Sequence, residues 1–198
     1  ESKNVVVLID GVRSQTDGIG ALTVTNVPLS QVERVEILRG NAGALYGEAA
    51  IGGVISVTTR VGGGEPKAYG STMLGSRRTS ELTAGFGGKL NDISFDLNGG
   101  SAETLGFSSM NASKNLTVNP DRDSSRSQFV GASVNQKIDS DLRLGLRANA
   151  KNSTTDYDVD NNWSGLKTDT HQFQIKSDTV GAFASRRITE AWMMDIDV

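Results

Sequence analysis

The sequence predicts a small α+β unit followed by a long series of antiparallel strands. The first 60 residues combine short apolar runs with a glycine-broken segment at 28–60, which reads as strand, sharp turn and strand. A breaker cluster, Val-Gly-Gly-Gly-Glu-Pro, follows at 61–66. From residue 67 onward, apolar and polar residues alternate with the period of two that is typical of strands.

Composition excludes several classes of protein. The 198 residues contain 20 basic and 23 acidic side chains, so the net charge is −3 and no polybasic surface for nucleic acid is expected. The chain has no cysteine, which excludes disulfides, thiolate catalysis and cysteine zinc sites. Its longest purely aliphatic run, 5–9, is far shorter than the roughly 20 residues of a membrane-spanning helix.

The second part of the chain reads as seven strands. Their expected ranges are 67–76, 80–90, 93–103, 126–138, 142–155, 173–188 and 191–198. In the fifth strand every second residue is apolar, so the apolar face carries no charge. The apolar residues are Leu142, Leu144, Leu146, Ala148 and Ala150, and between them lie Arg143, Gly145, Arg147, Asn149 and Lys151. Short turns at 91–92, 139–141 and 189–191 alternate with long polar loops at 104–126 and 155–172. This alternation of loop lengths is typical of an antiparallel transmembrane β-barrel.

Several separated blocks in the first 60 residues carry a family signature. The blocks VVVLIDGVR, ERVEILRG, LYG and AIGGVISVTTR closely resemble, in order and spacing, the plug domain of TonB-dependent outer-membrane receptors. The family usually has proline after the arginine-glycine pair, where this chain has Asn41. The resemblance implies that 1–62 is the C-terminal part of a plug domain. It also implies that 67–198 forms the N-terminal strands of the barrel, about seven of 22.

The resemblance implies transport across the bacterial outer membrane without bond chemistry. Its partners would be membrane lipid, a scarce metal chelate and the TonB energy-coupling complex, which would engage an N-terminal box preceding residue 1. A ferric siderophore is the first expectation for the ligand, and cobalamin (vitamin B12), with loops ordered by calcium, is the alternative. Two other classes stay open, a passive outer-membrane channel or adhesin and a soluble β-sandwich binding module.

The resemblance also assigns roles to two sets of residues. Arg34, Glu36 and Arg39 match family positions that face the inner barrel wall, so they are expected to form plug–barrel contacts; the alternative is an exposed strand face. The loop 14–21 matches plug loops that reach the external vestibule. The residues of that loop expected to bind ligand are Gln15, Thr16 and Asp17.

An acidic run in the second long loop resembles the start of a calcium loop. Asp156, Asp158 and Asp160 alternate, and a hard cation such as calcium prefers several oxygen ligands. The match then fails, because the sixth and twelfth positions carry Asn161 and Lys167 instead of glycine and glutamate. A solvated acidic loop is the alternative.

Catalysis is not expected. The single histidine, His171, lies in a predicted external loop with no positioned nucleophile or acid in the local sequence. Asp195 and Asp197 are two residues apart on a strand and share a face, which a solvated surface explains. The sequence therefore predicts no catalytic residue and no enzyme.

Overall fold

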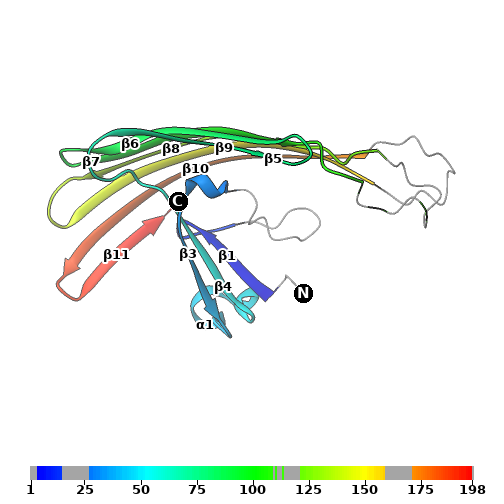
Figure 1. Cartoon of the computed structure of the whole chain (residues 1–198). Helices are drawn as coiled ribbons and strands as arrows, with labels where there is room; N and C mark the ends of the chain where they lie inside the picture. Colours follow the sequence, from blue (N-terminus) through cyan, green and yellow to red (C-terminus); the bar gives the residue numbers. More distant parts are fainter. Residues whose placement is uncertain are drawn as a thin grey trace.

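The computed structural model describes residues 4–14, 27–108, 110, 113, 121–158 and 171–197. They form a four-stranded mixed sheet and a seven-stranded antiparallel sheet (Figure 1). We call the first the N-terminal sheet and the second the wall. The chain passes from one to the other between Thr59 and Lys67.

The N-terminal sheet is built from two short apolar strands and the glycine-broken segment. Its strands are β1 (Val5–Ile9), β2 (Val12–Arg13), β3 (Val32–Arg39) and β4 (Gly53–Thr59), in the order β2-β1-β4-β3. Strands β1 and β4 are parallel, whereas β1–β2 and β3–β4 are antiparallel. Short helices lie at Leu29–Gln31, Gly43–Tyr46 (α1) and Glu48–Ala50.

A small apolar core holds this sheet together. Val6 and Val54 come from the paired strands β1 and β4, and Ala42 and Ala50 close the core from the segment between β3 and β4. The alanines leave room for the α1 turn to lie close to the strands. The core is internal to the N-terminal sheet and its short helices.

The turn after β3 is held by an asparagine side chain. Gly40 has a φ of 96°, which favours glycine, and the Oδ1 of Asn41 accepts a hydrogen bond from the Gly43 backbone N–H at 3.0 Å. Asn41 stands where the resembling family usually has proline. Here the turn is therefore constrained by a side-chain hydrogen bond instead of a fixed φ.

The wall has the seven strands that the alternation predicts. They are β5 (Lys67–Gly75), β6 (Thr79–Leu90), β7 (Ile93–Thr104), β8 (Ser125–Lys137), β9 (Leu142–Tyr157), β10 (His171–Thr189) and β11 (Trp192–Asp197). Each strand pairs with its sequence neighbour, so the order is β5 to β11 without a crossover. The predicted ranges agree with these bounds to within two residues.

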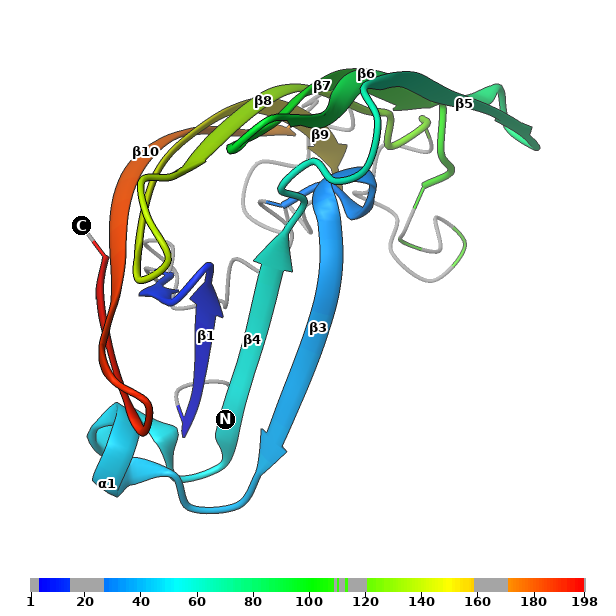
Figure 2. The same ribbon diagram turned by 90° about the vertical axis from the view of Figure 1, so that its left-hand side faces the viewer.

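The wall is curved, and the N-terminal sheet lies on its concave side (Figure 2). The convex face carries exposed apolar side chains, among them Leu82, Leu97, Val130 and Leu146. The concave face carries the buried polar residues Thr83, Asp96 and Ser133. This is the distribution expected of a barrel segment with lipid outside and a polar, filled interior.

The short turns are stabilised locally. Between β8 and β9, the backbone N–H groups of Asp141 and Leu142 donate to Asp139 Oδ1 at 2.7 and 2.8 Å. These hydrogen bonds favour the charged form and hold the pKa of the Asp139 carboxyl below its usual range.

None of the helices among the described residues is long and apolar enough to cross a membrane.

Phe183 departs from the alternation of β10 because its aromatic side chain faces the concave side. Its cross-strand partner on β9 is Gly145, and a Cβ at position 145 would overlap the Phe183 ring. Gly145 therefore provides the space in which the ring lies flat against the wall.

Gly145→Ala tests this packing in the intact protein. We expect a loss of about 1–3 kcal/mol of stability, because the added methyl group forces the ring away from its partner strand. Circular dichroism during heating would register a lower unfolding midpoint. Gly63→Ala is the matched control, since a Cβ there has nothing within 4 Å. Equal midpoints for the two variants would contradict the packing described here.

Candidate functional site

The N-terminal sheet contacts the wall along a narrow band of its concave face. The strand register aligns two rows of residues there, two positions apart along each strand. The first row contains Lys67, Gly87, Asp96, Ser133, Arg147 and Gly181, and the second contains Tyr69, Gly85, Asn98, Gly131, Asn149 and Thr179. We call these two rows the docking band. Because the band contains glycines among its polar residues, the wall offers both close approach and hydrogen-bonding groups.

Asp10 makes the strongest contact with the band. It lies in the two-residue turn between β1 and β2, where Asp10 and Gly11 have φ angles of 52° and 87°, as a type I′ hairpin requires. Its carboxylate accepts hydrogen bonds from Thr59, at 2.7 Å from the backbone N–H and 2.6 Å from Oγ1. The carboxylate thus ties the turn to the end of β4.

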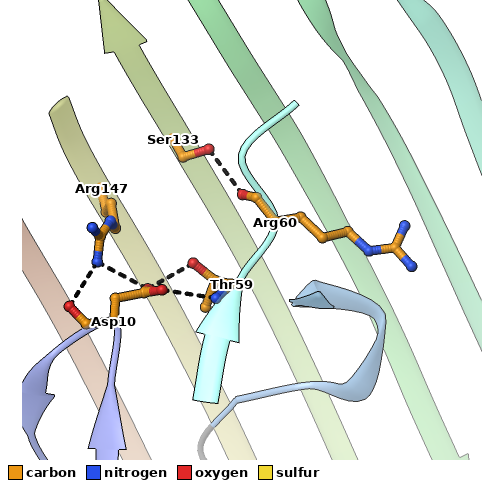
Figure 3. A network of polar contacts seen from close by, with 5 residues as sticks. All are labelled: Asp10, Thr59, Arg60, Ser133 and Arg147. Atoms are coloured by element: carbon orange, nitrogen blue, oxygen red, sulfur yellow. Dashed lines mark hydrogen bonds and ion pairs between the residues drawn. The ribbon is translucent and has the colours of Figure 1, made fainter. Parts of the chain in front are cut away.

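The same carboxylate forms an ion pair with Arg147 of β9. Arg147 Nη1 lies 3.3 Å from Asp10 Oδ2 and also donates to the Asp10 carbonyl oxygen at 3.1 Å (Figure 3). Only 7% of the Asp10 side chain and 18% of the Arg147 side chain are exposed. Since the pair is largely removed from water, losing either partner would leave a buried uncompensated charge.

The wall itself positions the Arg147 guanidinium. Arg147 Cζ lies 4.6 Å from the centre of the Phe183 ring, which is within the range of a cation–π contact. The ring is in turn fixed against Gly145. Arg147 is therefore held between an aromatic face on the wall and a carboxylate on the N-terminal sheet.

Two uncharged contacts lie beside this ion pair. Gln31 is 3% exposed, and its Nε2 donates to Asn98 Oδ1 on β7 at 2.8 Å. Ser133 Oγ on β8 donates to the Arg60 carbonyl oxygen at 3.1 Å (Figure 3). The backbone N–H of Arg60 donates to the Gln31 carbonyl oxygen at 2.8 Å, so the two contacts are joined on the side of the N-terminal sheet.

Gly131 makes the Gln31 contact possible. A Cβ at position 131 would overlap Gln31 Nε2. The side-chain amide thus occupies the volume that any other residue at 131 would fill.

A large polar space separates the N-terminal sheet from the wall beside the docking band. It has a volume of about 890 Å³. Charged residues from both sides line it, among them Arg34, Lys137, Arg143 and Asp195. Among the described residues, an ion pair and a few hydrogen bonds join the N-terminal sheet to the wall, and the apolar cluster of Val6, Ala42, Ala50 and Val54 lies within the N-terminal sheet.

Arg34, Glu36 and Arg39 all lie on β3 and are exposed. Arg34 Nε and Glu36 Oε2 are 3.3 Å apart, with 64% and 60% of their side chains exposed. Arg34 also lines the polar space that faces the wall. Contact between these three residues and a barrel carboxylate stays a prediction.

The expected ligand residues Gln15, Thr16 and Asp17 lie outside the described residues, as does Asp160. Asp156 and Asp158, in contrast, are described and belong to different clusters. Asp156 accepts hydrogen bonds from Ser124 Oγ and from Gln172 Nε2, the latter at 3.0 Å.

Asp158 lies in an acidic group with two residues from the preceding long loop. Carboxylate oxygens of Asp121, Asp123 and Asp158 lie within 4.8 Å of one another, and Asp158 is buried. Its Oδ2 also accepts hydrogen bonds from Ser108 Oγ at 2.6 Å and from the Met110 backbone N–H at 3.3 Å. Three carboxylates from two loops provide oxygen ligands of the kind that calcium prefers.

The sequence did not single out the residues of the docking contact. Asp10 was recognisable as part of a turn, because aspartate-glycine follows a run of apolar residues. Arg147 appeared only as one of several polar residues on the inward face of its strand, and Gln31 carried no signal. Asp10 and Arg147 meet only because of how the N-terminal sheet lies on the wall, and a local sequence pattern does not encode that position.

Known proteins resemble the chain in both sequence and structure. Residues 1–54 match the family model of the TonB-dependent Receptor Plug Domain. The vitamin B12 transporter BtuB of Vibrio vulnificus is 31% identical over 161 residues, covering 79% of this chain and 25% of that protein. BtuB of Photobacterium profundum is 29% identical over 157 residues, with the same coverage. The chain thus spans about a quarter of the length of these relatives.

Solved receptor structures share the fold. The ferric yersiniabactin uptake receptor FyuA of Yersinia pestis superimposes with a TM-score of 0.76 at 18% identity, covering 98% of this chain and 31% of that one. The ferripyoverdine receptor of Pseudomonas aeruginosa superimposes with a TM-score of 0.75 at 14% identity, covering 97% of this chain and 27% of that one. In this fold the N-terminal sheet corresponds to the plug and the wall to barrel strands. The chain therefore belongs to the TonB-dependent receptors of the bacterial outer membrane.

Proposed function

We propose that this chain is part of an active transporter in which the TonB energy-coupling complex displaces the plug to admit a bound ligand. The observation that carries the proposal is the mode of docking: a buried ion pair and two hydrogen bonds hold the N-terminal sheet beside a polar space. A plug must seal the barrel at rest and yield when it is pulled. Polar contacts meet both needs, because water can replace them once the plug moves.

The Asp10–Arg147 pair acts as the latch in this proposal. Attraction between its charges is offset by their removal from water, so the intact pair contributes modestly to net stability. Removing one residue of the pair costs free energy, because the other charge stays buried without a partner. Separating the two charges and hydrating both does not carry this cost. Pulling on the N-terminal segment would separate them together, since Asp10 directly follows β1.

We propose cobalamin or a related corrinoid as the ligand. The relatives described above are vitamin B12 transporters at 29–31% identity over most of this chain. This support reverses the order expected from sequence alone, in which a ferric siderophore came first. The proposed ligand contacts remain Gln15, Thr16 and Asp17, which fall in the sequence between β2 and β3.

Calcium is the proposed structural ion of the external loops. Asp121, Asp123 and Asp158 would supply three of the six to eight oxygens that calcium takes. The burial of Asp158 favours an ion, because clustered carboxylates that are partly removed from water repel one another. Bound calcium would join the two long loops over the entrance.

A ferric siderophore is the second candidate ligand. FyuA and the ferripyoverdine receptor have the same fold over nearly the whole chain. Their identities of 14–18% support the fold alone, which is why we rank this ligand second.

The latch is tested by Arg147→Ala in the full-length receptor. We expect a loss of about 3–5 kcal/mol in docking, because the buried Asp10 carboxylate loses its countercharge. Trypsin cleavage of the plug in the purified, ligand-free receptor measures this loss. Arg126→Ala is the matched control: Arg126 pairs with Glu103 at 3.5 Å, but both side chains are mostly exposed, so little change is expected. Equal cleavage of both variants would refute the latch.

The ligand is tested by complementation with the full-length receptor in cells that lack their own corrinoid receptor. We expect growth on limiting cyanocobalamin only when TonB is present. Iron-limited growth on single ferric siderophores, in cells without siderophore receptors, tests the second candidate in parallel. Growth on cyanocobalamin without TonB would contradict active transport. Growth with a ferric siderophore but not with cyanocobalamin would show that the ligand is the siderophore and not a corrinoid.

The calcium site is tested with Asp158→Asn in the full-length receptor. We expect calcium affinity, measured by isothermal titration calorimetry, to fall about tenfold or more, because the variant removes one charged ligand. Asp139→Asn is the control, since that carboxylate is exposed in a short turn at the other end of the wall. Unchanged affinity in Asp158→Asn would exclude this site.

A further inference from the structure

A chain of four polar side chains crosses the docking band and ends on the N-terminal sheet. Tyr69 Oη donates to both carboxylate oxygens of Asp96, at 2.9 and 2.8 Å. Asn98 Nδ2 donates to Asp96 Oδ1 at 2.6 Å. Asn98 Oδ1 accepts from Gln31 Nε2 at 2.8 Å. The first three residues belong to the wall, and only Gln31 belongs to the N-terminal sheet.

The direction of every hydrogen bond in this chain follows from Asp96. An ionised carboxylate has no proton to donate, so its neighbours must all present donors. Tyr69 presents its hydroxyl proton and Asn98 presents its amide N–H₂. The Asn98 amide is planar, so turning its nitrogen toward Asp96 turns its oxygen toward the N-terminal sheet.

Burial makes this orientation consequential. Asp96 is 4% exposed and Gln31 is 3% exposed, so water cannot readily replace a mismatched contact. If the oxygen of Asn98 faces the N-terminal sheet, residue 31 must offer a donor. An acceptor there would meet an acceptor and leave both unsatisfied.

We propose that Asp96, supported by Tyr69, is a positioning residue that makes the wall a docking site for one side-chain donor, the amide of Gln31. Asp96 does not touch the N-terminal sheet through this chain; it acts by orienting Asn98. The contact is selective for hydrogen-bond polarity, which distinguishes it from the Asp10–Arg147 latch, where charge is decisive. Its role in holding the plug at rest depends on the transport function proposed above.

Two neighbours shape the same docking site. Gly131 leaves the volume that the Gln31 amide enters. The guanidinium of Arg60 lies 5.7 Å from the centre of the Tyr69 ring, on the linker that joins β4 to β5. The site is therefore closed on one side by wall backbone and on the other by the covalent link between the two sheets.

The proposal predicts a specific rescue between two single variants. In Gln31→Glu, a carboxylate faces the Asn98 oxygen; in Asp96→Asn, the orientation of Asn98 is no longer imposed. In the double variant Gln31→Glu/Asp96→Asn, Asn98 can turn over, accept from Asn at position 96 and donate to Glu at position 31. The polarity of the chain is reversed, every group is satisfied, and the net charge equals that of the wild type.

Docking is measured by the rate of trypsin cleavage of the plug in the purified full-length receptor, without ligand or TonB. Cleavage in native conditions reports the population of the undocked state when docking is fast. We expect Gln31→Glu to raise the rate about tenfold, the effect of losing one buried hydrogen bond with an unsatisfied group. The double variant should return to within about twofold of the wild type.

A second double variant controls for charge. Gln31→Glu/Asp178→Asn has the same net charge as the first double variant. Asp178 lies on β10, where it pairs in register with Ala150 of β9, and it is not a member of the hydrogen-bond chain that contains Asn98. This second double variant should be cleaved as fast as Gln31→Glu alone. Rescue by Asp178→Asn, or no rescue by Asp96→Asn, would overturn the polarity mechanism.

Because the assay needs neither ligand nor TonB, it separates this inference from the proposed function. If the rescue occurs but complementation fails, the docking site stands and the transport proposal fails. If complementation succeeds without rescue, the polarity mechanism is wrong.

Discussion

The structure depends on the position of one carboxylate, that of Asp10. It joins the β1–β2 turn to the end of β4 through two hydrogen bonds from Thr59, and it forms an ion pair with Arg147 of the wall. The residue is one of the few types that tolerate the left-handed conformation of this turn and also carry a charge. Local backbone geometry and long-range docking therefore constrain the same position, and a substitution that meets one demand fails the other.

The inner surface of the wall is adapted to this close approach. Tyr69, Phe129 and Phe183 pair in register with Gly85, Gly100 and Gly145, and each ring lies where a Cβ of its glycine partner would be. The rings therefore lie along the wall and do not project into the interior. This keeps the docking band shallow enough for backbone turns of the N-terminal sheet to reach polar groups such as Ser133. It also explains why Phe183 breaks the apolar alternation of β10.

Sequence patterns predicted the fold well because each strand of the wall is defined locally. Alternation with period two, short turns and long loops fix strand bounds without knowledge of the partner. The docking contact was not predictable in this way. Asp10 and Arg147 are 137 residues apart, and several other polar residues on β8 and β9 share the inward face with Arg147. The acidic loop was recognised from Asp156 and Asp158, but Asp121 and Asp123 join Asp158 only through the pairing of β8 with β9.

The distribution of apolar side chains explains why docking is polar. The core of the N-terminal sheet, formed by Val6, Ala42, Ala50 and Val54, is satisfied within that sheet. The apolar side chains of the wall face outward, where the membrane provides their environment. Among the described residues, the ion pair and the side-chain hydrogen bonds that join the two sheets come from paired polar groups. Such contacts are specific in geometry but gain little free energy over their hydrated state, because each group exchanges a protein partner for water. A plug held in this way is ordered at rest and can still be withdrawn, and this balance is set by the inward alternation of the wall strands.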